Sequence, residues 1–375
     1  MKALLLSSWL ILLLGSTMLF GESKPRIVSP DVQADGHVTF RFSDPNAVKV
    51  SLSLEGQKTP TPMRKDEDGI WSVTLGPLQP DFYGYNFNAD DVNLVDPSNT
   101  MLKPNLLTLS NELHIPGTSL PWEVADVPHG EIHHHFYHSR LAEDDRDFYV
   151  YTPPGYDPNG KNEYPAFYLL HGFSDDASGW TAVGRANVIL DNLIAQGKAK
   201  PMIVVMTFGY GDMEIVRRGW DASSDKELAW RNLSRFTDIL LGEVMPQVEG
   251  EYRIKKDRES RAIAGLSMGG AESLLTGLNH PEQFTWIGAF SSGGIDNRDF
   301  AIEFPNVDSS ANQKLKLLWI ACGTEDSLIK INRQFKSWLK DKGVQFTDIE
   351  TPGMHTWMVW RRNLSTLVPL LFQAK

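Results

Sequence analysis

Apolar and polar residues alternate in short runs over the first part of the chain, from about residue 27 to residue 111. Val38-Thr39-Phe40-Arg41-Phe42 and the run from Val48 to Leu54 place apolar side chains at every second position. This is the spacing of a half-buried β-strand. Turn residues such as Asp68-Gly69 and Gly76-Pro77 separate the runs. The pattern predicts a small β-sandwich over residues 22–115.

The pattern changes after about residue 130, where strand-like and helix-like runs follow one another. Tyr164 to Leu170 and Arg261 to Leu266 are apolar runs of strand length, whereas Ala186 to Ala195 carries apolar residues at helical spacing. Alternating strands and helices predict an α/β domain over residues 130–375, with a mostly parallel sheet between two layers of helices. The proline-marked stretch 116–129 is predicted to be a linker.

The N-terminus has the pattern of an export signal. Lys2 precedes an apolar segment from Ala3 to Leu14, and small residues follow before the polar stretch that begins at Glu22. We interpret residues 1–21 as a cleaved signal peptide, which predicts a secreted or periplasmic protein with no membrane association after cleavage. An uncleaved N-terminal anchor is the alternative.

Charge and cysteine content narrow the classes of function. The 375 residues carry a formal net charge of -11, which argues against a nucleic-acid-binding protein because that class needs a basic surface. The single cysteine, Cys322, excludes an internal disulfide and a cysteine-based zinc site. It ends an apolar run, so we expect a buried structural thiol.

A cluster of histidines invites a metal interpretation. His133, His134 and His135 are consecutive and His138 follows, but in a strand His134 would point away from its two neighbours. The chain has no His-Glu-x-x-His motif and no phosphate-binding Gly-x-x-x-x-Gly-Lys motif. We therefore expect exposed strand histidines, no metal site and no cofactor.

The strongest chemical motif is Gly265-Leu266-Ser267-Met268-Gly269, with Gly270 after it. It follows a predicted strand and precedes a helix-compatible run, which is the context of a Gly-x-Ser-x-Gly nucleophile elbow. Glycines two positions before and after the serine are expected because the sharp turn leaves no room for side chains there. Ser267 is the predicted nucleophile.

A serine nucleophile needs a base and an orienting carboxylate, in the chain order serine, acid, histidine. Of the two histidines beyond Ser267, His280 falls at the predicted end of the elbow helix, so His355 is the predicted base. Asp326 follows a buried strand and is the predicted acid, with Glu325 as its close rival. The other acidic candidates in this part of the chain are Asp296, Asp299 and Asp348.

The negative charge that develops on the ester oxygen needs two backbone N–H donors. The residue after the nucleophile, Met268, is expected to supply one. Phe173, in the loop after the strand that ends at Leu170, is expected to supply the other, with Gly172 as the alternative. His171 in that loop is expected to hold the loop by hydrogen bonds.

Five segments of the second domain form a recognisable set: Pro153 to Tyr156, Tyr164 to Gly172 with Trp180, Gly265 to Gly270, Gly323 to Asp326, and Gly353 to His355 with Trp357 and Trp360. Taken together, they resemble the esterase group of α/β-hydrolases that includes carbohydrate esterase family 1, with feruloyl and acetylxylan esterases, and is related to enterochelin esterases. The resemblance covers roughly residues 130–372 and implies an α/β-hydrolase fold with Ser267, Asp326 and His355 as the triad.

The first domain contains the segments Val38 to Phe42, Asp68 to Trp71, Tyr83 to Phe87 and Asp96 to Asn99. On these segments it resembles an early-set, immunoglobulin-like β-sandwich of the type found in carbohydrate-binding module family 48. The Asp-Gly turn of that family is Asp90-Asp91 here. Trp71 could stack on a sugar, although a core position is the stronger interpretation.

The resemblance implies a secreted serine esterase that acts on ester-decorated plant cell-wall polysaccharides, most simply a feruloyl esterase acting on arabinoxylan. Acetylxylan esterase and enterochelin-type siderophore esterase are the alternatives within the enzyme class. A catalytically inactive carbohydrate-binding protein is the alternative from another class. Trp180 is a candidate substrate-binding residue, and loops at Tyr210 to Trp220 and Ser291 to Ser310 are expected to line the pocket.

Overall fold

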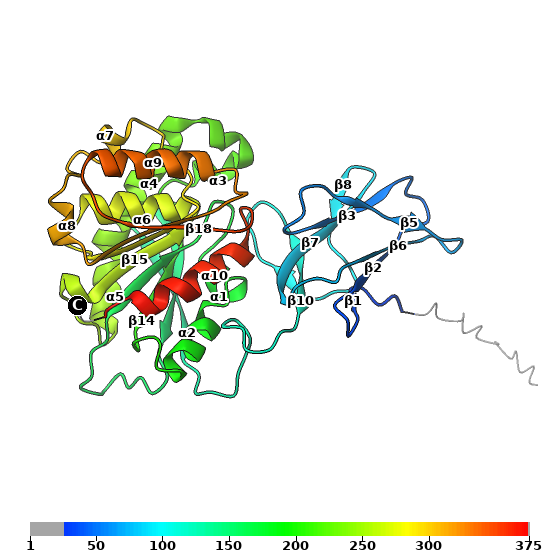
Figure 1. The fold of residues 1–375 in the computed structure, drawn as a ribbon, viewed down its shortest axis with the longest axis horizontal. Helices are drawn as coiled ribbons and strands as arrows, with labels where there is room; N and C mark the ends of the chain where they lie inside the picture. The colour runs from blue at the N-terminus through cyan, green and yellow to red at the C-terminus, as the bar shows by residue number, and fades with distance from the viewer. Residues whose placement is uncertain (1–25, 374–375) are drawn as a thin grey trace, which may run out of the picture.

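The computed structural model describes residues 26–373. Its strands and helices form two bodies that lie side by side (Figure 1). We call the part from β1 to β10 the front domain and the part from β11 onward the α/β domain. The predicted signal peptide, residues 1–21, lies outside the described residues.

The front domain contains two antiparallel sheets. One has the strand order β1-β2-β6-β5, and the other has the order β4-β3-β7-β10-β9 with β8 paired to β7. The strands are β1 (Asp31–Val32), β2 (Val38–Ser43), β3 (Val50–Leu54), β4 (Thr61–Pro62), β5 (Arg64–Lys65), β6 (Ile70–Leu75), β7 (Asp81–Ala89), β8 (Val92–Leu94), β9 (Leu102–Lys103) and β10 (Ser110–Ile115).

Side chains from both sheets meet in one core. Phe40 from one sheet contacts Tyr85 from the other edge to face, with ring centroids 5.0 Å apart, and both side chains are buried. Trp71 is also in this core, and its indole Nε1 donates to the backbone oxygen of Asp44 at 2.9 Å. Trp71 is therefore a core residue here, as expected. The immunoglobulin-like assignment stays a prediction.

The turn at Asp90-Asp91 departs from the Asp-Gly pattern but keeps its backbone conformation. Both residues have positive φ, 47° and 70°, which a two-residue hairpin turn requires at both central positions. The Asp90 carboxylate accepts hydrogen bonds from the N–H groups of Val48 and Lys49. These bonds compensate for the missing glycine.

The α/β domain is built on one eight-stranded sheet with the order β11-β12-β14-β13-β15-β16-β17-β18. Neighbouring strands run parallel from β14 to β18, whereas β11 and β12 join antiparallel. The strands are β11 (Glu131–Ser139), β12 (Asp144–Thr152), β13 (Ala166–Leu170), β14 (Ile203–Thr207), β15 (Arg261–Leu266), β16 (Trp286–Phe290), β17 (Leu317–Gly323) and β18 (Thr347–Thr351).

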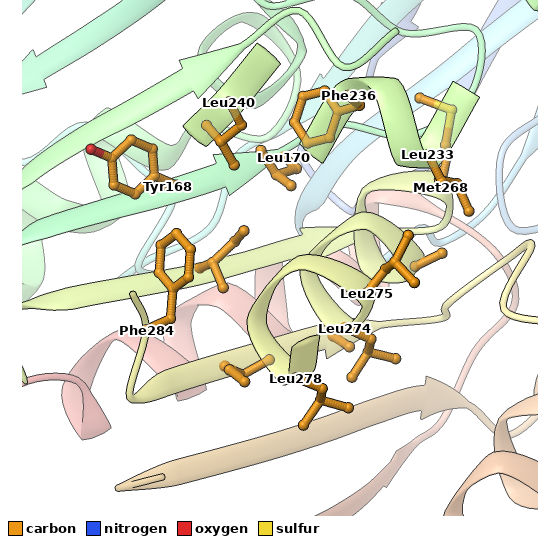
Figure 2. Close-up of a cluster of buried hydrophobic side chains, with 14 of the residues drawn as sticks. Tyr168, Leu170, Leu233, Phe236, Leu240, Met268, Leu274, Leu275, Leu278 and Phe284 are labelled. Atoms are coloured by element: carbon orange, nitrogen blue, oxygen red, sulfur yellow. The ribbon is translucent and has the colours of Figure 1, made fainter. Parts of the chain in front are cut away.

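Helices cover both faces of this sheet (Figure 1). On one face, α4, α6 and α9 bury an apolar layer in which Phe236 lies close to the strand residue Leu170, and Leu274, Leu275 and Leu278 gather on α6 (Figure 2). On the other face, α2 and α10 pack against a second buried cluster. The helices are α1 (Gly179–Ala182), α2 (Ala186–Ala195), α3 (Glu214–Arg217), α4 (Lys226–Ile239), α5 (Met245–Glu251), α6 (Met268–Asn279), α7 (Phe300–Glu303), α8 (Ala311–Lys314), α9 (Ile329–Asp341) and α10 (Trp357–Leu367).

Helix α4 starts at Lys226 because the Asp225 carboxylate accepts the N–H of Leu228 and caps the first turn. A π-helical turn, Leu240–Val244, then joins α4 to α5. Within residues 26–373, no helix combines the length and the apolar character needed to cross a membrane.

The stretch predicted to be a linker is held firmly against the α/β domain. Trp122 is 5% exposed and belongs to the buried cluster on the α2 face. The Asn192 side chain of α2 donates to the backbone oxygens of Pro121 and Glu123 at 2.8 and 2.7 Å. Residues 121–123 of the predicted linker are therefore packed against α2.

A buried ion pair joins the two domains. Arg361 of α10 donates through Nε and Nη2 to Asp81 Oδ1, at 3.1 and 2.8 Å, and both side chains are fully buried. Arg361 also donates to the backbone oxygen of Val183 at 2.8 Å, and Arg362 reaches the second oxygen of Asp81 at 3.0 Å. Asp81 is the first residue of β7, so this network fixes the front domain on α10.

Replacing Asp81 with asparagine should destabilise the protein strongly. The substitution keeps the volume but leaves the Arg361 charge buried without its partner, and breaking such a pair costs about 3–5 kcal/mol. Denaturant unfolding followed by tryptophan fluorescence measures the change. The matched control is Asp91→Asn, which breaks an exposed pair with Lys49 and should leave the midpoint unchanged. Equal midpoints for Asp81→Asn and wild type would show that the pair does not hold the domains together.

Candidate active site

Ser267 lies at a sharp turn between β15 and α6. Its φ and ψ angles are 52° and -114°, a conformation that costs a residue with a side chain roughly 1–3 kcal/mol. A Cβ on Gly265 would lie 2.4 Å from the oxygen of Gly269, and a Cβ on Gly269 would lie 2.4 Å from the oxygen of His171. The two glycines of the motif are therefore required by backbone contacts on both sides of the turn.

The structure brings Ser267, His355 and Asp326 into one hydrogen-bonded chain. His355 Nε2 lies 3.0 Å from Ser267 Oγ, and His355 Nδ1 lies 2.8 Å from Asp326 Oδ2. Ser267 comes from the turn after β15, Asp326 from the loop after β17, and His355 from the loop between β18 and α10. All three loops leave the carboxyl ends of parallel strands, which meet at one edge of the sheet.

The Asp326 carboxylate is held in its charged form. Burial of the side chain would raise its pKa, but hydrogen bonding to His355 and the charge of that ring, together with the N–H of Leu328, keep the pKa below its usual value. A buried carboxylate that stays ionised can hold the Nδ1–H tautomer of the imidazole. The rival residue Glu325 instead forms an exposed ion pair with Lys58 of the front domain, at 3.6 Å.

The loop after β13 lies directly beside Ser267. A Cβ on Gly172 would lie 3.2 Å from the Cβ of Ser267. Within residues 26–373, the N–H groups of Phe173 and Met268 donate to no protein acceptor. His171 is buried in this loop, and its Nε2 accepts the N–H of Gly209 at 2.9 Å while Nδ1 lies 2.8 Å from the oxygen of Gly172. It has the loop-holding contacts that were expected.

Comparison with known proteins places the chain in a family. The family described as "Putative esterase" matches residues 139–371, which is more than half of the chain. The chain belongs to this family. It is 31% identical over 353 residues to an endo-1,4-β-xylanase/feruloyl esterase of Xylanibacter ruminicola, covering 92% of this chain and 46% of that protein. The chain therefore spans about half the length of that relative.

A second curated relative is an acetyl esterase of Caldicellulosiruptor saccharolyticus, 24% identical over 234 residues, which cover 53% of this chain and 79% of that protein. Among solved structures, a CE1 ferulic acid esterase from Anaeromyces mucronatus matches with a TM-score of 0.56 and 25% identity, covering 67% of this chain and 93% of that one.

The enterobactin esterase of Shigella flexneri shares the fold over a longer stretch. It matches with a TM-score of 0.69 at 17% identity and covers 90% of this chain and 93% of its own. That coverage is more than the α/β domain alone supplies, so the likeness in fold extends into the front domain. None of these similarities assigns the front domain to a carbohydrate-binding module.

Aromatic side chains lie around the proposed N–H donor of this esterase-family chain. Phe173 meets Trp220 edge to face with ring centroids 5.3 Å apart, and Tyr210 at 6.3 Å. Trp220 is 57% exposed. The expectation that the region from Tyr210 to Trp220 contributes to the surroundings of the site therefore agrees with these contacts.

The expectation that Trp180 binds substrate is wrong for this structure. Its side chain is 0% exposed, its Nε1 donates to the backbone oxygen of Leu170 at 2.8 Å, and its ring packs against Trp357. An indole that is fully buried and hydrogen-bonded to a strand is part of the core. Trp180 supports the start of α10 and does not face the substrate.

The histidines of β11 were expected to be exposed, and this holds for His134 and His138, whereas His133 and His135 are half-buried. His280 follows the last residue of α6, at the end opposite Ser267. His134 and His138 pair with Asp147 and Asp145 along the edge of the sheet. In the described part of the chain, no group of three His, Cys, Asp or Glu side chains is placed to hold a metal ion. Cys322 is buried, and burial raises its pKa to about 12.

Two residues near the site, Glu55 and Asn105, were not found from the sequence, and Ser291 was expected only as the first residue of a loop that lines the pocket. Ser291 accepts a hydrogen bond from Trp360 Nε1 and contributes to the low pKa of Asp326. Glu55 and Asn105 of the front domain contact the loops around His355 and Phe173. No local motif marks them, because their partners are 302 and 70 positions away in the chain.

Replacing Gly265 with alanine should disable the site. The added methyl group would overlap the backbone of Gly269, so Ser267 must move, and a displacement of about 1 Å can cost roughly 100-fold in rate. We expect an unfolding free energy lower by about 1–3 kcal/mol and a large loss of ester hydrolysis, measured by calorimetry and a chromogenic ester. Gly250→Ala is the control: nothing lies within 4 Å of its Cβ position in α5, so both quantities should be retained.

Proposed function

We propose that this chain is a serine carboxylic-ester hydrolase in which Ser267 is the nucleophile, His355 the base and Asp326 the orienting acid. The observation that carries the proposal is the continuous hydrogen-bonded chain from Ser267 Oγ through His355 to Asp326, at 3.0 and 2.8 Å. These distances suit proton transfer from a hydroxyl to an imidazole that a carboxylate orients. Membership of an esterase family supports the same reaction class.

In the first half of the reaction, Ser267 Oγ attacks the ester carbonyl carbon while His355 Nε2 takes the hydroxyl proton. The carbonyl oxygen becomes negatively charged and accepts hydrogen bonds from the N–H groups of Met268 and Phe173. The carbon–oxygen bond to the alcohol then breaks. His355 returns its proton to the departing alcohol oxygen, and the acyl group remains on Ser267.

In the second half, water attacks the acyl carbon and His355 Nε2 takes a proton from that water. The new tetrahedral species again places its charge on the same two N–H groups. When it collapses, the bond to Ser267 Oγ breaks and His355 gives the proton back to the serine. The net reaction converts ester and water into acid and alcohol, and the charged Asp326 stabilises the imidazolium in both halves.

The substrate class that we propose is an ester of a plant cell-wall polysaccharide, with ferulate on arabinoxylan as the first candidate. The relative that covers 92% of this chain is named a xylanase/feruloyl esterase. The exposed Trp220 ring beside Phe173 gives the site an aromatic surface suited to an aromatic acyl group. We further propose export, supported by the apolar segment near the N-terminus.

Two other esters and one other class remain as alternatives. The acetyl esterase relative supports acetylxylan. The enterobactin esterase supports a siderophore ester through its fold alone, because the identity is 17%. A carbohydrate-binding protein without activity is less favoured, since the hydrogen-bonded chain at Ser267 is intact. Release of ferulate, acetate or dihydroxybenzoyl-serine separates the three esters.

Ser267→Ala should lower the release of ferulate from feruloylated arabinoxylan oligosaccharides by roughly 10^4-fold or more, since loss of the nucleophile removes the covalent route. The melting temperature should stay close to that of the wild type. Chromatography of released acids measures the effect, with acetylated xylan and a siderophore ester as parallel substrates. Retained hydrolysis in this variant would contradict the assignment of Ser267 as the nucleophile.

Asp326→Asn should lower kcat by roughly 10^4-fold, because an amide cannot hold the required imidazole tautomer or stabilise the imidazolium. Glu325→Gln is the matched control in the adjacent position. Its carboxylate pairs with Lys58 and not with His355, so kcat should stay within about twofold. If the Glu325 variant lost activity and the Asp326 variant kept it, the two assignments would have to be exchanged.

A further inference from the structure

A segment of the front domain lies on the loop that carries Phe173. Asn105 Nδ2 donates to Ser174 Oγ at 2.9 Å and to Asp175 Oδ1 at 3.1 Å. The N–H of Leu106 donates to the backbone oxygen of Ser174 at 2.7 Å. Ser174 and Asp175 are buried. Three hydrogen bonds from the front domain therefore end on the two residues that follow Phe173.

Ser174 needs such support because its backbone is strained. Its φ is 73°, in the left-handed region that costs a residue with a side chain roughly 1–2 kcal/mol. Such conformations persist where surrounding contacts over-determine them, and they gather at functional sites. Here the hydrogen bonds to the Ser174 side chain and carbonyl come from the front domain, whereas the α/β domain holds the next residue through Tyr210 Oη, which donates to the backbone oxygen of Asp175 at 3.0 Å.

Asn105 is itself held rigidly. Its Oδ1 accepts the N–H groups of Leu107 and Thr108, both at 3.0 Å, which forms a local turn. The side chain thus uses its oxygen to order its own segment and its amide hydrogens to reach the α/β domain. A substitution at position 105 that keeps the oxygen but removes the amide hydrogens would separate these two functions of the side chain.

A second front-domain contact reaches the helix that follows His355. Glu55 Oε1 accepts the N–H of Trp357, the first residue of α10, at 2.9 Å. Its other oxygen accepts the N–H of Gly84 at 2.8 Å and lies 3.3 Å from Lys103 Nζ. A carboxylate at a helix N-terminus satisfies an otherwise free N–H and interacts favourably with the helix dipole. The start of α10 is two residues from His355.

We propose that the front domain is a positioning part of the catalytic centre. Asn105 fixes the loop that presents the Phe173 N–H, and Glu55 fixes the helix start that follows His355. Both are positioning residues, because neither touches the reacting atoms. The inference rests on the proposed function of Ser267. It adds that hydrolysis of any ester, including one too small to contact the front domain, depends on these two contacts.

The physical reason lies in the geometry that an oxyanion requires. Removing one donor from an oxyanion hole costs about 10²–10³-fold in kcat, and a misplaced donor loses part of that effect. The Phe173 N–H belongs to a loop without regular secondary structure, with a strained residue next to it. A loop that can relax at Ser174 would present that N–H less accurately in the transition state, while ground-state binding would change little.

The test uses the full chain with Asn105→Asp and 4-nitrophenyl acetate as the ester. The aspartate keeps the oxygen that accepts from Leu107 and Thr108, but it lacks the donors for Ser174 and Asp175. We expect kcat to fall about tenfold with KM within about twofold. A fluorophosphonate that reacts with the serine gives the concentration of active sites, and the rate is divided by that concentration. An incompletely folded preparation is then not mistaken for a slow enzyme.

The pH dependence gives a second readout for this variant. Burial raises the pKa of Asp175 to about 7, while Lys103 and the Asn105 hydrogen bond lower it and Asp176 and Glu55 raise it. A carboxylate at position 105 raises it further. As the pH falls, the pair of carboxyl groups gains a proton that can restore one donor. The ratio of variant to wild-type kcat per titrated site should therefore increase from pH 8 to pH 6.

Two further variants complete the test. Glu55→Gln removes the charge at the start of α10 and should also lower kcat per titrated site. Lys58→Ala is the matched control, because it removes another contact between the domains, the 3.6 Å pair with Glu325 whose side chains are 74% and 52% exposed. Its kcat should equal that of the wild type.

Wild-type kcat per titrated site in both Asn105→Asp and Glu55→Gln would overturn the inference and leave the proposed function intact. An equal loss in Lys58→Ala would also overturn it, since the effect would then follow from any weakening between the domains. Activity in Ser267→Ala would remove the proposed function itself. A loss in the two positioning variants alone, at constant KM, supports the inference.

Discussion

The buried Arg361–Asp81 pair is the interaction on which the arrangement of this molecule depends. A guanidinium and a carboxylate that are both fully buried are stable only when each keeps its partner. The pair joins α10 to the first residue of β7, and α10 begins two residues after His355. Helix α10 therefore binds the front domain through Arg361 and begins next to the loop that holds His355. The front domain therefore contacts the same helix that follows His355.

Strain is concentrated around the nucleophile and is held by contacts from several directions. Ser267, Ser174 and Ser291 all have positive φ, and all three lie in loops at the carboxyl ends of the parallel strands. Neighbouring glycines, backbone hydrogen bonds and the front domain each hold part of this arrangement. The proposed chemistry needs such rigidity, because the donors for the developing charge must be in place before that charge forms.

Several parts of the site could be predicted from local sequence, because their chemistry imposes a local pattern. The glycines around Ser267 follow from the turn, and the order of Asp326 and His355 after it follows from the topology of the sheet. Trp180 was predicted incorrectly as a substrate contact. An aromatic residue beside a site motif has the same local pattern whether it faces solvent or the core, and only the packing of α10 places this ring inside.

The sequence by itself predicted the two kinds of domain and the residues Ser267, Asp326 and His355, which the structure brings into one hydrogen-bonded chain, because periodicity and motif spacing are properties of short segments. The tertiary structure alone decided that Trp122 of the predicted linker is packed, and that Asn105 and Glu55 reach the loops around the site. Those contacts join residues up to 302 positions apart. Nothing in either local segment requires them. They exist because a buried charge pair fixes one folded domain against another.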